Sequence, residues 1–146
     1  MATYITRNFT LEELTASTIA RSLKIDNTPT TQAIINLTAL AVIVLQPLRE
    51  AMGQSIKIGS GYRSVKLNAA VGGVSNSQHV SGQAADLCID GDIEKGKKWF
   101  RYIKMHLVYD QLIWEKNPKT GSYWIHVSYR ADGCNRKQVI DYLEKK

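Results

Sequence analysis

Two of the three histidines in this sequence lie in settings that suit metal binding. His79 stands in a polar, glycine-containing segment seven residues before Asp86, and His126 lies in the middle of the strand-like run YWIHVSY. A polar ring inside such an aromatic and aliphatic strand needs a partner if it is buried. Two neutral imidazoles and a carboxylate suit zinc, and they leave a fourth position open for water, as in catalytic sites. The spacing alone also fits a solvated loop histidine and a hydrogen-bonded strand histidine.

Three sequence motifs resemble those of a known enzyme family. Residues 77–86 (SQHVSGQAAD) resemble the S-x-H-x-x-G-x-A-x-D signature of the zinc D-alanyl-D-alanine peptidases, which share the hedgehog/DD-peptidase fold. Residues 60–64 (SGYRS) are similar to the arginine-bearing turn of that family, and residues 124–128 (WIHVS) to its second histidine strand. The likeness extends from residue 9 to residue 129. It implies one zinc ion, held by His79, Asp86 and His126.

The resemblance also implies an activity, the hydrolysis of a peptide bond in the stem peptides of bacterial peptidoglycan. The enzyme would be a zinc metallopeptidase, either a D-Ala-D-Ala carboxypeptidase or an endopeptidase such as a phage endolysin. Residues 1–4 lack the basic and then apolar pattern of a secretory signal, so we expect a cytoplasmic protein that reaches the wall after release at lysis. Because the fold also occurs in proteins that bind zinc without evident hydrolysis, a non-catalytic, zinc-containing domain that binds the cell wall is the alternative.

The general base is expected on a different strand from the one that carries it in many family members. They have a glutamate three residues before the last histidine, where this chain has Tyr123. If residues 118–121 form a hairpin loop, Ile113 pairs with His126, and Glu115 then points to the same face as His126. A slip of one residue would send Glu115 to the other face. We expect Glu115 to accept the proton of the attacking water, the alternative being a solvated carboxylate paired with a lysine.

Two further side chains are implied to act on the substrate. Taken by itself, Arg63 is also explained as a surface arginine on a turn. The resemblance implies instead that Arg63 contacts the substrate, either stabilising the developing oxyanion or gripping a carboxylate through a bidentate fork. Ser77 is implied to hydrogen-bond the substrate. Gly82, between the first two ligands, is expected to let the chain turn sharply.

Hydrophobic spacing predicts two helical regions in the first third of the chain. Residues 10–13 read as a capping box, which begins a helix that continues to about residue 21. A longer helical pattern covers residues 31–52. Pro47 is expected to kink or restart this helix, and Gly53 to end it.

The later part of the sequence alternates as strands, mostly joined by hairpin-type connections. Asp110 is expected to be a solvated group at a strand end, the alternative being a partner that orients a ligand histidine. The tail from Asn135 fits either a strand or a helix. Helices first and strands later predict an α+β fold, with a small antiparallel sheet flanked by helices in a single domain of residues 1–146. The expected strands are 55–59, 85–90, 110–115 and 122–129, and the expected later helices are 65–71 and 92–105.

Composition narrows the possible partners. The chain has 146 residues, of which 44% are hydrophobic and 22% charged, as in globular domains. Its net charge of +6 favours polyanions, including an anionic cell wall, but no nucleic-acid-binding motif is present. The longest apolar run, residues 40–45, is too short to span a bilayer. We therefore expect a monomer that binds neither nucleic acid nor the membrane interior, with Cys88 and Cys134 as reduced thiols.

Overall fold

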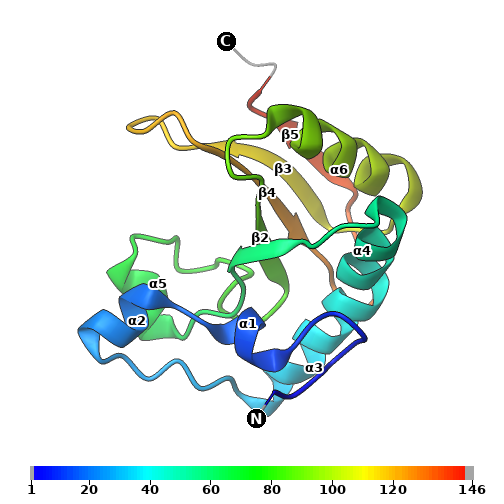
Figure 1. The fold of residues 1–146 in the computed structure, drawn as a ribbon. Coiled ribbons are helices and arrows are strands. Elements are labelled where there is room, and N and C mark those ends of the chain that lie inside the picture. The colour runs from blue at the N-terminus through cyan, green and yellow to red at the C-terminus, as the bar shows by residue number, and fades with distance from the viewer. Residues whose placement is uncertain (1, 144–146) are drawn as a thin grey trace.

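A five-stranded sheet forms the centre of the protein, whose computed structural model describes residues 2–143 (Figure 1). The strands lie in the order β1-β2-β4-β3-β5. The first four are antiparallel to their neighbours, whereas β5 runs parallel to β3 at the edge. This confirms the α+β fold and adds a parallel edge strand from the undecided tail. The bounds are β1 Lys57–Ser60, β2 Ala84–Cys88, β3 Gln111–Lys116, β4 Tyr123–Ser128 and β5 Gln138–Asp141.

The N-terminal helical region is broken in two, where one helix was expected. The predicted capping box begins α1 (Leu11–Thr15), with the Thr10 side chain accepting from the Glu13 amide and the Glu13 carboxylate accepting from the Thr10 amide. The chain then becomes extended at Ala16, and Ser17 caps a second helix, α2 (Thr18–Leu23). The prediction of a continuous helix to residue 21 was therefore wrong, because the Ser17 hydroxyl accepts from a backbone amide and starts a new helix.

One long helix is assembled from α3 (Thr31–Leu40), a π-helical segment η1 (Ala41–Leu45) and α4 (Gln46–Met52). The wider π turn comes directly before Pro47, which lacks an amide hydrogen and crowds the preceding turn. Gly53 ends the helix in the left-handed conformation, with φ +63°, as predicted. Among the described residues, this helix (31–52) is the one that could cross a membrane by length and composition alone. Its inward side chains are nevertheless buried in the core, as in the central helix of a folded domain.

Two further helices follow along the chain, α5 (Val65–Ala70) and α6 (Ile93–His106). Figure 1 shows α6 and the α3–α4 helix on the same side of the sheet. Gly96 lets α6 approach the sheet closely, since a Cβ there would lie 2.5 Å from the ring of Trp114. The core between these helices and the sheet contains Trp99, Ile103, Leu87, Leu112, Trp114, Ile125 and Val127.

The two faces of the sheet therefore have different surroundings. Successive strand residues point to opposite faces, so the apolar residues Leu87 and Ile125 face the helices. Their neighbours Asp86, His126 and Trp124 point to the other face, where they line a cleft. The polar face of the sheet is the one available for chemistry.

Candidate active site

Three adjacent strands bring the predicted site residues together on this polar face. Asp86 on β2 lies opposite His126 on β4, and His126 also lies opposite Ile113 on β3. Glu115 lies opposite Trp124, two residues from Ile113. Glu115 and His126 are therefore diagonal neighbours on one face. The register predicted from the hairpin loop is confirmed.

The loop before β2 supplies the third member of the group, His79. Its side chain is only 3% exposed, and its Nδ1 lies 2.7 Å from the Gly61 carbonyl oxygen. A carbonyl can only accept, so Nδ1 carries the proton and Nε2 has its lone pair free for a ligand bond. The Arg63 amide in turn donates to the His79 carbonyl at 3.0 Å. The loop thus fixes both the position and the tautomer of the ring.

The three side chains converge as a metal site requires. Asp86 Oδ1 lies 3.3 Å from His79 Nε2 and 3.1 Å from His126 Nδ1, and one ligand atom from each residue lies within 4.8 Å of the others. Burial alone would raise the pKa of Asp86, but its close contacts with the His126 and His79 rings outweigh burial and hold this pKa below its usual value. Two imidazoles and an ionised carboxylate are a donor set that fits zinc and leaves a coordination position open.

Gly82 shapes the turn between His79 and Asp86. Its φ of +75° is the left-handed conformation that favours glycine. An added Cβ would also lie 2.6 Å from the Ala33 carbonyl oxygen on α3. The turn therefore needs glycine both for its backbone conformation and for its close packing on the long helix.

Substitution of Gly82 by alanine should therefore destabilise the protein more than the same change at Gly72. Gly72 also has a positive φ, of +78°, but a Cβ there meets no atom within 4 Å. We expect Gly72→Ala to lower the free energy of unfolding by about 1 kcal/mol from backbone strain, and Gly82→Ala by about 2–4 kcal/mol because a clash is added. Urea denaturation of the two variants measures the difference. Equal losses would show that Ala33 moves aside freely.

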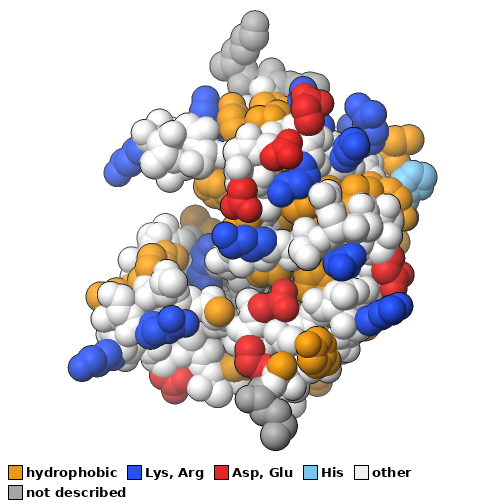
Figure 2. Space-filling model, viewed as in Figure 1, with side chains coloured by type: hydrophobic (Ala, Val, Ile, Leu, Met, Phe, Trp, Pro, Cys, Tyr) orange, Lys and Arg blue, Asp and Glu red, His pale blue; other side chains and the backbone are white. Residues whose placement is uncertain are grey.

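A cleft of about 420 Å³ lies over the metal ligands. A second hollow of about 700 Å³ adjoins it and shares Asp86 and Trp124 with it. In Figure 2 the molecule is hollowed at the left, between the β3–β4 hairpin and the part that carries α2 and α5. The cleft over the metal ligands is lined by every predicted site residue: Arg63, Ser77, His79, Asp86, Glu115 and His126.

Glu115 has the properties of a proton acceptor in this cleft. Its side chain is half-buried, and no residue in the described part of the chain forms an ion pair or hydrogen bond with it, so the alternative of a lysine-paired carboxylate does not apply there. Burial raises the pKa of Glu115; the nearby His126 opposes this rise and Asp86 adds to it. A carboxylate without a partner beside the metal ligands is available to take a proton.

Arg63 lies inside the site rather than on the surface. Its side chain is 17% exposed, and Nη2 lies 3.7 Å from Asp86 Oδ2. The other nitrogens donate to neighbours, Nε to Ser60 Oγ and Nη1 to Asn68 Oδ1, both at 3.1 Å. The reading as an ordinary surface arginine was wrong. The positive charge is fixed beside a metal ligand, where it can offset negative charge.

Ser77 and Trp124 lie in the cleft, whereas Trp114 lies in the core. The Ser77 hydroxyl accepts from the His79 amide at 3.2 Å and lines the cleft, so it orders the histidine loop. Trp114 is buried in the core, while Trp124 lines the cleft. Cys88 and Cys134 are free thiols, as expected.

One pair of charged residues beside the cleft was missed by the sequence analysis. Asp110, expected to be solvated, is completely buried and accepts from the Nε and Nη2 atoms of Arg136 at 3.0 and 2.7 Å. These bonds outweigh burial and lower the pKa of Asp110 to about 2. The expectation was wrong because the partner comes from the tail, whose conformation the sequence left undecided. That tail joins the sheet at Gln138, whose backbone amide donates to the Asp110 carbonyl.

An open cleft with two histidines, an aspartate and an unpaired glutamate is typical of metal-dependent hydrolases. Residues 7–128 match the peptidase M15 family, and the chain belongs to that family. Over 44 residues the chain is 54% identical to the zinc D-Ala-D-Ala carboxypeptidase of Streptomyces albus G. The aligned stretch is 30% of this chain and 17% of that relative, so the chain matches less than a fifth of the relative's length.

Proposed function

We propose that the protein is a zinc-dependent peptidase that hydrolyses a peptide bond in the stem peptides of bacterial peptidoglycan. The observation that carries the proposal is the meeting of a three-residue metal site and an unpaired glutamate in one cleft. Membership of the peptidase M15 family supports the reaction type, and the name of the carboxypeptidase relative supports the metal and the substrate.

The proposed mechanism assigns a separate task to each side chain of the cleft. Zinc, when bound by His79, Asp86 and His126, lowers the pKa of water and polarises the scissile carbonyl. Glu115 takes the proton from the attacking water and delivers it to the leaving amine. Arg63 offsets the negative charge that develops on the carbonyl oxygen, and Ser77 hydrogen-bonds the peptide. Arg63 and Ser77 are both held by hydrogen bonds to other residues of the chain, so they need little reorganisation during the reaction.

The rival function, a zinc-containing domain that binds the wall without cutting it, does not require a proton acceptor at Glu115. A structural zinc site is closed by four protein ligands, whereas the described residues offer three around an open position. Such a domain also has no use for a half-buried carboxylate without a partner. Both observations favour hydrolysis.

Digestion of purified peptidoglycan tests the proposal. We expect the zinc-loaded protein to release new termini, a chelator to abolish this release, and added zinc to restore it. Mass spectrometry of the fragments distinguishes the loss of one D-alanine, as a carboxypeptidase would cause, from internal cleavage by an endopeptidase. If the zinc-loaded protein leaves peptidoglycan intact and the chelator merely lowers the melting temperature, the wall-binding function is correct.

The remaining expectations concern the setting of the reaction. A net charge of +6 supports attraction to an anionic wall. A monomeric state, the absence of nucleic-acid and membrane partners, and cytoplasmic storage before release by a phage-type lysis all stay predictions. Light scattering of the purified protein measures the first of them directly.

A further inference from the structure

Arg136 lines the same cleft as the metal ligands, yet it lies outside the part of the chain that the family comparison covers. It stands in the loop between β4 and β5, whereas the family match ends at residue 128. Its side chain is 53% exposed. A cation open to solvent at the rim of a substrate cleft is suited to recognising an anionic group.

The Arg136 guanidinium is held from behind by a buried carboxylate. Asp110 is 0% exposed and accepts from Nε and Nη2 of Arg136, and from the Arg136 backbone amide at 2.9 Å. Gln78, the residue before His79, donates at 2.8 Å to Asp110 Oδ2, the oxygen that also accepts from Arg136 Nη2. This network connects the arginine to the loop that carries a metal ligand, and it fixes the guanidinium before any substrate arrives.

Asp110 occupies one edge of the guanidinium and leaves another available. An arginine has five N–H donors, and the two side-chain bonds to Asp110 use the hydrogen on Nε and one on Nη2. Within residues 2–143, nothing else bonds these nitrogens, so both hydrogens on Nη1 and one on Nη2 remain. That outer edge has the two parallel donors that bind a carboxylate in a bidentate fashion.

The other arginine of the cleft is less suited to this role. All three guanidinium nitrogens of Arg63 already face Ser60, Asn68 or Asp86, and its side chain is only 17% exposed. Arg136 is the more exposed of the two and has the freer donors. Arg63 is the arginine that contacts a metal ligand, and Arg136 is the one with free donors toward the cleft.

We propose that Arg136 is a specificity-determining residue that binds a carboxylate of the substrate peptide through its Nη1–Nη2 edge, while the scissile bond lies over the metal ligands. This inference rests on the proposed peptidase function. The carboxylate is either the C-terminus of the peptide or the free carboxylate of an internal acidic residue. Both have the same chemistry toward a guanidinium, and amidation of one or the other distinguishes them.

Matched peptide substrates test the assignment on the zinc-loaded protein. One has both carboxylates free, a second has an amidated C-terminus, and a third has the internal carboxylate amidated. We expect one of the two amidations to raise KM by about 10- to 100-fold with a smaller change in kcat, as the loss of a charge-assisted hydrogen-bonded pair implies. The amidation that has this effect identifies the source of the carboxylate.

Substitution of Arg136 should reproduce that effect from the protein side. Arg136→Gln is expected to raise KM for the free acid by a similar factor, and amidation should then add little, because both changes remove the same contact. Arg136→Lys keeps the charge without the fork and should recover part of the loss. Arg130→Gln is the matched control, since Arg130 also pairs with an aspartate, Asp132, at 2.7 Å but does not line the cleft.

The outcomes separate this inference from the function on which it rests. Equal KM values for all three substrates with the parent protein would overturn the role of Arg136 while leaving the peptidase intact. The role of Arg136 would also be overturned if Arg136→Gln and Arg130→Gln had the same KM for the free acid. If no peptide is cleaved at all, the proposed function fails as well. Should Arg136→Gln not fold, because Asp110 loses its partner, Arg136→Lys, which keeps a positive charge beside Asp110, takes its place in the comparison with the three substrates.

Discussion

Replacing Glu115 by glutamine is expected to lower kcat on a peptidoglycan peptide by about 100- to 10,000-fold, the usual contribution of a general base. Glutamine has nearly the same size and keeps a hydrogen-bonding group, but its amide cannot take a proton from water. Glu115 is not one of the three converging ligands, so the variant should bind one zinc ion as the parent does. Steady-state kinetics and metal analysis of the same preparation measure both effects.

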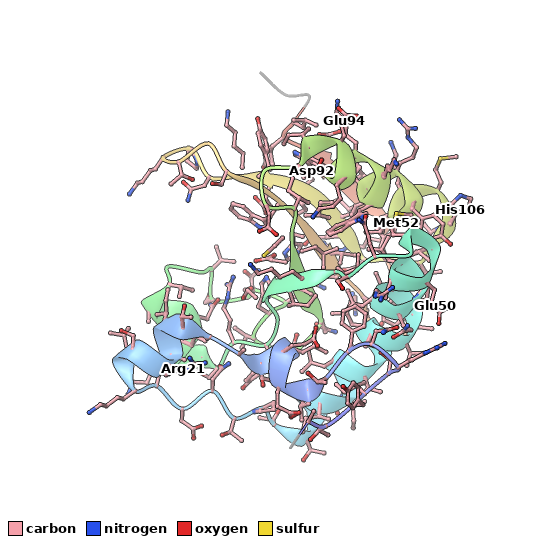
Figure 3. All side chains as sticks on the ribbon, in the orientation of Figure 1. Arg21, Glu50, Met52, Asp92, Glu94 and His106 are labelled. Atoms are coloured by element: carbon pink, nitrogen blue, oxygen red, sulfur yellow. The ribbon has the colours of Figure 1, made fainter. Side chains whose placement is uncertain are left out.

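The same chemical change elsewhere provides the control for Glu115. Glu94 lies on α6, where it pairs with Lys97 (Figure 3), and it does not line the cleft over the metal ligands. Glu94→Gln should leave kcat unchanged. If Glu115→Gln cleaves as fast as the parent, Glu115 has no part in the reaction and another group must accept the proton.

The position of the base follows from strand geometry. A residue three places before His126 on a strand points to the opposite face from the histidine. Tyr123 accordingly packs toward the core, with its ring 6.2 Å from that of Trp114. A carboxylate at position 123 would therefore point away from the face that carries the metal ligands. Glu115 on the paired strand reaches the open face, so in this chain the base and the second histidine come from different strands.

The part of the site that the sequence predicted is the part determined by short-range rules. Residues 118–121 form the loop of one hairpin, and the Asn117 amide donates to the Ser122 carbonyl. Each further pair of facing residues on β3 and β4 then follows by moving one residue along each strand. The two-residue period of a strand then decides which side chains share a face. Glu115 and His126 could be placed together from these two facts alone.

The features that the sequence analysis missed depend on contacts between distant residues. Asp110 looks like any polar residue before a strand, and its partners in the interior are distant in sequence, Gln78 by 32 residues and Arg136 by 26 residues. The tail that brings Arg136 there pairs with β3 as a parallel strand, for which no local turn sets the register. The break at Ser17 is different in kind, because two caps in close succession compete with the helical spacing that continues across them.

Replacing His126 by alanine is expected to remove the metal itself, and activity with it. Among residues 2–143 the predicted zinc site offers three protein ligands, and Asp86 would also lose the His126 ring that lies 3.1 Å from it. Loss of a partner that merely orients a ligand weakens metal binding by about 10- to 100-fold, so loss of a ligand should exceed about 100-fold. Isothermal titration calorimetry with zinc measures the change in zinc affinity.

The melting temperature provides an independent measure of the lost metal in His126→Ala. Zinc that binds the folded chain stabilises it, so the parent should melt at a higher temperature with zinc than with a chelator, and His126→Ala should melt alike in both. His106→Ala is the matched control, because that ring contacts Tyr102 at the end of α6, on the outer side of the molecule (Figure 3). The two active-site variants then distinguish metal binding from proton transfer. Glu115→Gln should keep the zinc-dependent rise in melting temperature but lose turnover, whereas His126→Ala should lose both. A His126→Ala protein that retains one tightly bound zinc would place the metal elsewhere in the chain.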